Sequence, residues 1–179
     1  MNYGEIKKCD IANGEGVRVS LFVSGCTHHC KNCFNSETWD FNFGKPFTKD
    51  VEDEIFAELE NDFVDGLSLL GGEPFEPDNQ RALLPFVKSV RERFPNKTIW
   101  CYSGYRFDDD LQSESRARCE CTDELLSLLD VLVDGEFVQD LYDISLSFRG
   151  SSNQRVIDVQ KSLNQNKVVL YNLKSGKIL

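Results

Sequence analysis

The stretch VRVSLFVSGCTHHCKNC, residues 17–33, decides how the rest of this sequence is interpreted. Residues 17–23 are apolar and rich in β-branched side chains, which predicts a buried strand. Ser24 and Gly25 end that strand, and the loop behind them has the spacing CxxxCxxC, with its cysteines at Cys26, Cys30 and Cys33. The stretch therefore predicts a cysteine loop at the carboxyl end of a core strand.

Strand and helix patterns alternate along the rest of the chain. Thr48 is a candidate N-cap for a helix through residues 51–60, where apolar side chains recur at helical spacing. Further strands are predicted at 66–70, 98–102, 131–133, 154–159 and 168–173, and further helices at 78–94 and 123–129. This order is typical of an α/β fold with a mainly parallel sheet covered by helices, here as a single domain over residues 1–179. Active loops are expected at the carboxyl ends of its strands.

The loop Gly71-Gly72-Glu73-Pro74 directly follows the strand predicted at 66–70. Paired glycines let a ligand approach the backbone closely, although such a pair at a strand end is more often only a turn, and a nearby Glu is usually solvated. Ser103 stands just past the next strand, where its hydroxyl could reach a ligand or bond its own backbone. The cysteine loop and the glycine loop are both expected at one edge of the sheet.

Composition argues against several classes of function. The 179 residues suffice for one domain with its own core, so the fold needs no stabilising disulfide bonds or structural metal sites. A formal charge of −10 argues against docking on nucleic acid or anionic lipid, because both need clustered Lys and Arg. No apolar run approaches the roughly 20 residues of a membrane span and no signal peptide is recognised, so a cytoplasmic protein is expected. Seven cysteines in such a chain indicate metal or redox chemistry rather than disulfides.

Three cysteines from one loop suit an iron–sulfur cluster with an open position. Electron carriers with a [4Fe-4S] cluster use four cysteines, so three leave one iron free to bind something other than protein. Structural zinc is the alternative, since Zn²⁺ accepts three cysteines and one histidine, and the loop contains His28 and His29. Buried free thiols are a second alternative, but this loop is polar. No role is assigned to the histidines or to the remaining cysteines, Cys9, Cys101, Cys119 and Cys121.

With its early strand, its CxxxCxxC loop and its GGE motif, the chain resembles the radical S-adenosylmethionine (SAM) superfamily. The resemblance implies an incomplete (partial) TIM-type barrel in which Cys26, Cys30 and Cys33 hold one [4Fe-4S] cluster and SAM binds its free iron. One electron from the reduced cluster then cleaves SAM to a 5′-deoxyadenosyl radical. Glu73 belongs to the motif that such enzymes use for the methionine amino group. The implied SAM contacts are Asn32, Cys33, Phe34, Gly71, Gly72, Glu73 and Ser103, and no catalytic acid or base is assigned.

Five further segments resemble the activating proteins of anaerobic (class III) ribonucleoside-triphosphate reductases. The similar segments are residues 13–18 (NGEGVR), 38–39 (TW), 100–105 (WCYSGY), 131–137 (VLVDGEF) and 148–155 (FRGSSNQR). The last two segments are the most specific to that family. The resemblance covers about residues 1–160, and both the charged stretch 108–121 and the tail after Lys161 fall outside it.

This second resemblance implies a protein substrate. The radical would abstract hydrogen from a glycine of the large reductase subunit, with electrons from a low-potential donor such as flavodoxin, so the site must admit a peptide loop. Arg149, Asn153 and Arg155 either contact that partner or hold the last loop by hydrogen bonds. Two alternatives stay open: another compact radical SAM enzyme with a small heterocyclic substrate, and a non-enzymatic iron–sulfur or zinc module.

Overall fold

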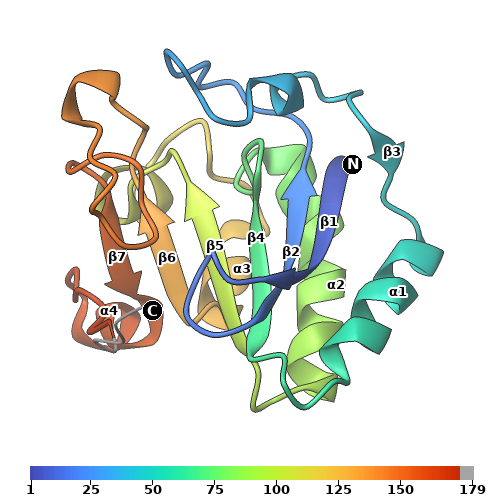
Figure 1. The fold of residues 1–179 in the computed structure, drawn as a ribbon. Helices are drawn as coiled ribbons and strands as arrows, with labels where there is room; N and C mark the ends of the chain where they lie inside the picture. Colours follow the sequence, from blue (N-terminus) through green and yellow to red (C-terminus); the bar gives the residue numbers. More distant parts are fainter. Residues whose placement is uncertain (174–179) are drawn as a thin grey trace.

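Within residues 1–173, which the computed structural model describes, seven strands form one sheet in the order β3-β1-β2-β4-β5-β6-β7 (Figure 1). The strands are β1 (Asn2–Asp10), β2 (Arg18–Val23), β3 (Lys45–Pro46), β4 (Gly66–Gly71), β5 (Thr98–Ser103), β6 (Val131–Asp134) and β7 (Arg155–Asp158). Strands β2, β4, β5 and β6 run parallel, and the pairs β1–β2, β1–β3 and β6–β7 are antiparallel. The predicted α/β fold with a parallel sheet at its centre is confirmed, whereas the incomplete barrel stays a prediction.

Four α-helices in the described part of the chain accompany the sheet. They are α1 (Lys49–Leu59), α2 (Pro77–Arg93), α3 (Thr122–Leu128) and α4 (Val159–Gln165). Short 3-10 helices occupy Ser36–Trp39 and Gln139–Leu141, and a π-helical turn occupies Phe107–Leu111. None of the helices in residues 1–173 is long and apolar enough to cross a lipid bilayer.

One predicted strand is absent from the structure, one predicted cap is present without its hydrogen bond, and one strand was not predicted. Residues 168–173 were expected to form a strand, but only Leu170 makes an isolated bridge, to Ile157, because the short β7 offers few partners on its outer edge. Thr48 is the N-cap of α1, yet its side chain makes no capping hydrogen bond. Strand β1 was not predicted, because its polar sequence lacks an apolar run and pairing with β2 places it. The end of the predicted domain, residues 174–179, lies outside the described residues.

The two faces of the sheet are covered differently. Side chains on one face join the main core with α1, α2 and α3; in the central strands these are Val19, Leu21, Val23, Leu67, Leu69, Ile99, Cys101 and Leu132. On the other face Trp100 packs edge-on against Phe148 and Tyr171, with ring centroids 5.4 and 5.5 Å apart. Tyr102 also lies on this second face, because side chains alternate along a strand.

The carboxyl ends of β2, β4, β5 and β6 meet at the upper edge of the sheet in Figure 1. Residues 24–44 leave β2 at this edge, and residues 135–154 leave β6 there. The loop after β4 carries the paired glycines. The predicted meeting of the cysteine and glycine loops at one edge is therefore confirmed.

Candidate functional site

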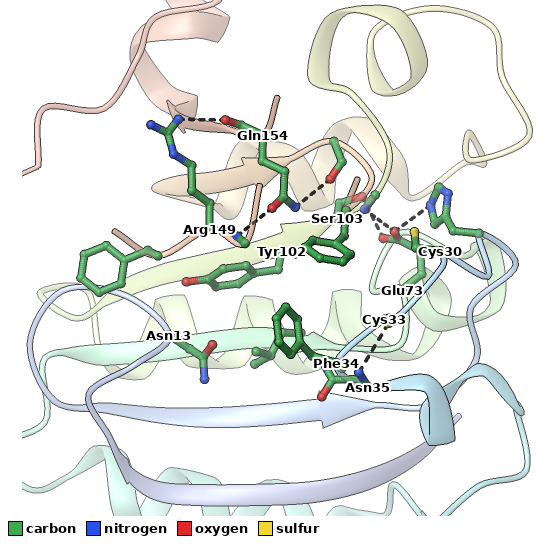
Figure 2. A pocket seen from close by; sticks show the side chains of 18 of the residues that line it. Asn13, Cys30, Cys33, Phe34, Asn35, Glu73, Tyr102, Ser103, Arg149 and Gln154 are labelled. Carbon is green, nitrogen blue, oxygen red and sulfur yellow. Dashed lines mark hydrogen bonds and ion pairs between the residues drawn. The ribbon is translucent and has the colours of Figure 1, made fainter. Parts of the chain in front are cut away.

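A cavity of about 520 Å³ opens at this edge of the sheet (Figure 2). Its walls come from the cysteine loop, the glycine loop after β4, the end of β5 and the segment 135–154. The predicted site residues that line it are Cys26, Cys30, Cys33, Phe34, Gly71, Gly72, Glu73 and Ser103. The structure thus brings together all but one of the residues predicted to bind a cluster or SAM.

Asn32 is the exception. Its side chain is exposed and is not among the residues that line the cavity. Its backbone has a φ of 58°, in the left-handed region, and that of His29 has a φ of 53°. Asn enters this region more readily than most residues, so the tight turn between Cys30 and Cys33 explains its place in the loop. A contact from Asn32 to SAM stays a prediction.

The three thiols of the cysteine loop are free. Cys26 is buried, and Cys30 and Cys33 are half-buried. Among residues 1–173, no three His, Cys, Asp or Glu side chains are placed to share a single metal ion. The ring of His29, a ligand in the zinc alternative, is engaged elsewhere, since it stacks on Trp39 with centroids 4.6 Å apart.

The surroundings of these thiols oppose their ionisation. Burial, followed by the negative charge of Glu73, raises the pKa of Cys26 to about 12. Burial, followed by the charge of Glu136, raises the pKa of Cys30 as well. Because metal centres bind the thiolate form, loading a metal centre at this loop releases protons.

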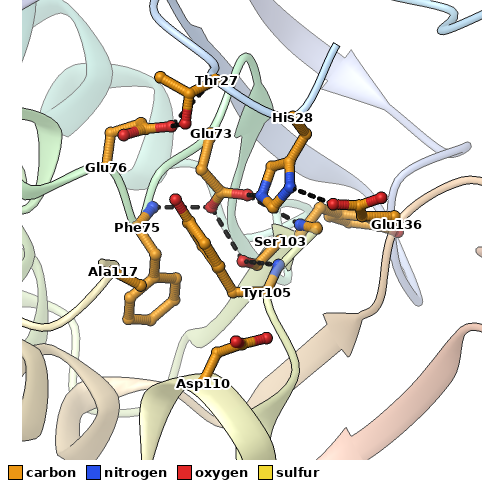
Figure 3. Close-up of polar contacts among 12 residues, drawn as sticks. Thr27, His28, Glu73, Phe75, Glu76, Ser103, Tyr105, Asp110, Ala117 and Glu136 are labelled. Atoms are coloured by element: carbon orange, nitrogen blue, oxygen red, sulfur yellow. Dashed lines mark hydrogen bonds and ion pairs between the residues drawn. The ribbon is translucent and has the colours of Figure 1, made fainter. Parts of the chain in front are cut away.

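Glu73 is the most constrained side chain of the site (Figure 3), with an exposed fraction of 1%. Its Oε1 accepts hydrogen bonds from Phe75 N at 2.8 Å and from Ser103 Oγ at 2.9 Å. Its Oε2 accepts one from Gly104 N at 2.8 Å and lies 3.1 Å from His28 Nε2. Both oxygens are thus occupied by protein groups. The carboxylate ties the cysteine loop, the glycine loop and the end of β5 together, and its contact with a methionine amino group stays a prediction.

His28 connects this carboxylate to the surface. Its Nδ1 lies 2.7 Å from Glu136 Oε1, and its ring packs against Tyr105 with centroids 4.3 Å apart. With a carboxylate at each ring nitrogen, the doubly protonated ring can donate two hydrogen bonds. Burial lowers the pKa of His28, but the hydrogen bonds to Glu73 and Glu136 raise it by more, so the net shift is upward. No role was predicted for His28, which in the structure links the cysteine loop to Glu73 and Glu136.

A second buried carboxylate holds the same loop. Glu76 Oε1 accepts hydrogen bonds from Thr27 N at 2.8 Å and Thr27 Oγ at 2.5 Å. Asn79, from the first turn of α2, donates to Ser24 O at 3.0 Å and to Glu73 O at 2.9 Å. Neither side chain was predicted from the sequence to support the site. The signal available was a set of polar residues, Glu73, Glu76 and Asn79, at three-residue intervals where α2 begins.

The end of β5 contributes two hydroxyl groups in opposite situations. Ser103 Oγ donates to Glu73 and accepts from Tyr105 N at 3.0 Å, so the protein itself uses it. The Tyr102 hydroxyl is buried, lies in the cavity wall and has no hydrogen-bond partner in the described part of the chain. An unpaired buried hydroxyl costs free energy until a ligand or water meets it. Tyr102 therefore marks a polar contact point for a bound molecule.

The polar side chains of residues 148–155 hold their own segment in place. Arg155 Nη2 pairs with the buried Asp134 Oδ2 at 2.5 Å. Arg149 and Asn153 each donate to a backbone carbonyl of the segment 135–154, at 2.8 Å. Of the two roles considered for these residues, the contacts favour the structural one, although Arg149 also lines the cavity.

The remaining cysteines lie away from the cavity. Cys9 is exposed on β1, and Cys101 is fully buried in the main core. Cys119 and Cys121 stand directly before α3. None of these four is among the residues that line the cavity.

Comparisons with known proteins agree with a cluster at this site. Residues 12–157 match the family described as the 4Fe-4S single cluster domain. The anaerobic ribonucleoside-triphosphate reductase-activating protein of Escherichia coli K12 is 44% identical over 158 residues, which are 87% of this chain and 97% of that protein. Proteins of the same name from Haemophilus influenzae and phage T4 are 44% and 40% identical, over 86% and 87% of this chain and 96% and 93% of their own lengths.

Proposed function

The chain belongs to the family of anaerobic ribonucleoside-triphosphate reductase-activating proteins, and we propose that it activates its reductase as a radical SAM enzyme. In this proposal Cys26, Cys30 and Cys33 hold a [4Fe-4S] cluster, and SAM binds beside it in the cavity. The product is a glycyl radical on the large subunit of the reductase.

One observation carries the proposal: three free thiols meet a glycine loop in a single cavity. A Cβ on Gly72 would lie 2.5 Å from Gly25 O, and a Cβ on Gly71 would lie 2.7 Å from Val23 O. Side chains larger than hydrogen are therefore excluded where the glycine loop touches the base of the cysteine loop. The glycine loop therefore packs directly against the base of the cysteine loop, and both line the cavity in which the proposed ligand binds.

The donor set fits a cluster better than a single ion. Three thiols come from one loop, and the cavity continues beyond them to Gly71, Gly72 and Tyr102. Three thiolates leave one iron of a [4Fe-4S] cluster to a small-molecule ligand. When bound, the cluster supplies the electron that cleaves SAM to a 5′-deoxyadenosyl radical.

The protein's own residues hold the site in shape. Glu73, Glu76 and His28 fix the cysteine loop against the start of α2, so that the thiols do not move apart when the cluster is absent. The unpaired Tyr102 hydroxyl is available to a polar atom of the bound molecule. Such fixed groups reduce the reorganisation that binding requires.

The incomplete barrel is part of this proposal. Phe22, Leu70 and Tyr102 line the cavity from adjacent parallel strands, on the face opposite the helices. This is where the interior of a (β/α) barrel lies, with its active site at the carboxyl ends of the strands. An open barrel also suits a protein substrate, because a peptide loop needs a wide entrance.

The remaining expectations are proposals too. We propose a low-potential protein such as flavodoxin as the electron donor and a cytoplasmic location, with no nucleic acid or membrane as partner. The formal charge of −10 supports the last point, because it disfavours polyanionic surfaces.

The competing functions differ in what they predict for the substrate. A radical SAM enzyme with a small heterocyclic substrate would cleave SAM but leave no radical on a reductase. Identity of 44% over 97% of an activating protein favours the reductase as substrate. A zinc or electron-carrier module would bind metal without cleaving SAM.

One anaerobic experiment separates these functions. The chain is reconstituted with iron and sulfide, reduced and given SAM, and 5′-deoxyadenosine is measured with and without the matching reductase large subunit. We expect 5′-deoxyadenosine and a glycyl radical on that subunit in the electron paramagnetic resonance (EPR) spectrum. Cleavage of SAM without any radical on the reductase would refute the proposed substrate, and a loaded cluster that leaves SAM intact would refute the mechanism.

A further inference from the structure

A group of exposed apolar side chains stands at the mouth of the cavity. This apolar rim consists of Phe34, Phe137, Tyr142 and Ile144, which line the cavity, and of Val138 and Leu141, which are exposed in the same segment 135–154 but do not line it. The exposed fractions are 71% for Phe34, 86% for Ile144, 44% for Tyr142 and 43% for Leu141. Isolated exposed apolar residues are ordinary, but a cluster at the entrance of a site indicates an interaction surface.

The aromatic members of the rim contact one another. The ring centroid of Phe34 is 5.3 Å from that of Phe137 and 6.2 Å from that of Tyr142, and Phe137 and Tyr142 are also 6.2 Å apart. A Cβ on Gly150 would lie 3.1 Å from the Phe137 ring and 3.3 Å from the Phe34 ring, so the rings pack over this glycine. Because the rings already pack together, a partner would order few side chains on binding.

Polar contacts fix the segment that carries the rim. Gln154 Nε2 donates to Gly135 O at 2.9 Å, and Gln154 Oε1 accepts from Gly150 N at 2.9 Å and Ser151 N at 3.1 Å. One amide thus joins the start of the segment 135–154 to its end. The rim is therefore held by the scaffold rather than by the partner.

The rim is continuous with the cysteine loop. Phe34 directly follows Cys33, and Phe34, Phe137, Tyr142 and Ile144 line the same cavity as the three thiols. A polypeptide that packs on the rim would place its backbone at the entrance to that cavity. A small metabolite enclosed in the cavity would gain little from side chains as exposed as Ile144 and Leu141.

The segment that carries most of the rim is mostly acidic. Glu136, Asp140 and Asp143 are exposed in it, and the cations that line the cavity are Arg149 from this segment and Lys7 from β1. Acidic side chains around an apolar patch favour a partner that carries Lys or Arg beside its apolar residues.

From these observations we infer that the apolar rim is the docking surface for the reductase large subunit. The element that docks is a short loop with apolar side chains around its target glycine and basic side chains at its borders. This inference rests on the proposed function and adds the surface by which this chain selects its substrate.

The test uses a double variant, Val138→Ser with Leu141→Ser, and a matched control, Phe63→Ser. Val138 and Leu141 are exposed rim residues that do not line the cavity. Phe63 is also an exposed apolar residue, 59% exposed, but it lies between α1 and β4, at the opposite edge of the sheet. Each reconstituted protein is assayed for iron content, for SAM cleavage without reductase, for binding to the large subunit and for glycyl radical yield at limiting activator.

The double variant should keep its iron and its reductase-free SAM cleavage within about twofold, while its dissociation constant for the large subunit rises about tenfold or more. Its radical yield should fall in proportion. Phe63→Ser should match the unchanged protein in every assay, and the conservative variant Leu141→Met should bind the large subunit within about threefold of the unchanged protein.

Three results would overturn the inference. The first is a double variant that binds and activates the reductase normally. The second is an equal loss in Phe63→Ser, and the third is a changed oligomeric state of the variant alone with reductase binding intact. Failure of the unchanged protein to form any glycyl radical would instead refute the proposed function, so the two failures are distinguishable.

Discussion

The cavity has two walls that are built alike but face it with different chemistry. The cysteine wall, residues 24–39 and 71–79, presents thiols and backbone, and buried acids brace it from behind. The rim wall, residues 135–154, presents exposed apolar side chains, and the amide of Gln154 braces it. In both walls internal hydrogen bonds hold the backbone, and the two walls differ in what they expose: free thiols in one and mainly apolar side chains in the other. Under the proposed function, the first wall serves the cofactors and the second serves the partner.

The largest effect should come from the cysteine wall. Cys30→Ala removes one of three thiols, so we expect loss of the cluster and of SAM cleavage to the detection limit, because two thiolates do not retain it. Cys119→Ala is the control, since Cys119 does not line the cavity. Iron and acid-labile sulfide per chain, with 5′-deoxyadenosine formed, measure both. Equal loss in the two variants would contradict the ligand assignment.

The bracing of the cysteine wall should matter next. Glu73→Gln keeps the shape of the side chain but replaces one oxygen, which accepts hydrogen bonds, with an NH₂ group, which donates them. In one orientation this NH₂ group faces Gly104 N and His28, and in the other it faces Phe75 N and Ser103, so donors meet donors in either case. We expect the free energy of unfolding to fall by about 2–4 kcal/mol, measured by anaerobic urea denaturation.

The matched control is Glu124→Gln. Glu124 pairs with Lys88 on the surface, with side chains 50% and 43% exposed, so it should change stability by less than about 1 kcal/mol. A similar loss of unfolding free energy in both variants would show that the buried contacts of Glu73 stabilise the protein no more than a surface ion pair does.

The bracing of the rim should have a smaller effect on stability and a selective effect on function. Gln154→Ala breaks the contacts to Gly135 and Gly150, so we expect destabilisation by about 1–2 kcal/mol. Radical transfer to the reductase should fall by a larger factor than SAM cleavage alone, because the rim loosens while the thiols stay fixed. Gln160→Ala, which removes two hydrogen bonds from α4 to backbone carbonyls at the end of α3, controls for stability. Equal losses in both activities would place Gln154 in the cofactor site instead.

The smallest effect concerns the stability of the fold at acidic pH. The hydrogen bonds from Arg155 lower the pKa of Asp108 to about 2, from a usual value of 3.8. A lowered pKa means that the ionised form is stabilised by folding, so this contribution is present above about pH 4 and is lost as the pH falls toward about 2. Asp108 is partly exposed, so the contribution should be below about 1 kcal/mol. Between these pH values, the free energy of unfolding of Asp108→Asn should fall less steeply with decreasing pH than that of the unchanged protein. The same pH dependence in both proteins would contradict this contribution of Asp108.

The sequence predicted the parts of the molecule that local patterns determine. The apolar runs at 17–23, 66–70, 98–102 and 131–133 became central strands, and the cysteine and glycine loops met at their carboxyl ends. The SAM contacts remain predictions, and the structure gives no support for that of Asn32.

Contacts between distant residues were beyond sequence reasoning. His28 meets Glu73 and Glu136 only because three separate strand ends converge. Arg18 is fully buried, where its guanidinium donates to Ser68 Oγ at 2.7 Å and Thr98 O at 2.8 Å; nothing in its local sequence indicates burial. The exposed rim was missed for the opposite reason, because apolar residues in a loop give no periodic signal.

The most direct test of the account is the spectrum of the cluster itself. The chain is loaded with ⁵⁷Fe, and Mössbauer and EPR spectra are recorded before and after addition of SAM. If three cysteines hold a [4Fe-4S] cluster with one open iron, SAM should change the signal of one iron and leave the other three nearly unchanged. A cluster whose spectra do not respond to SAM, or a loop that retains zinc in place of iron, would contradict the central claim.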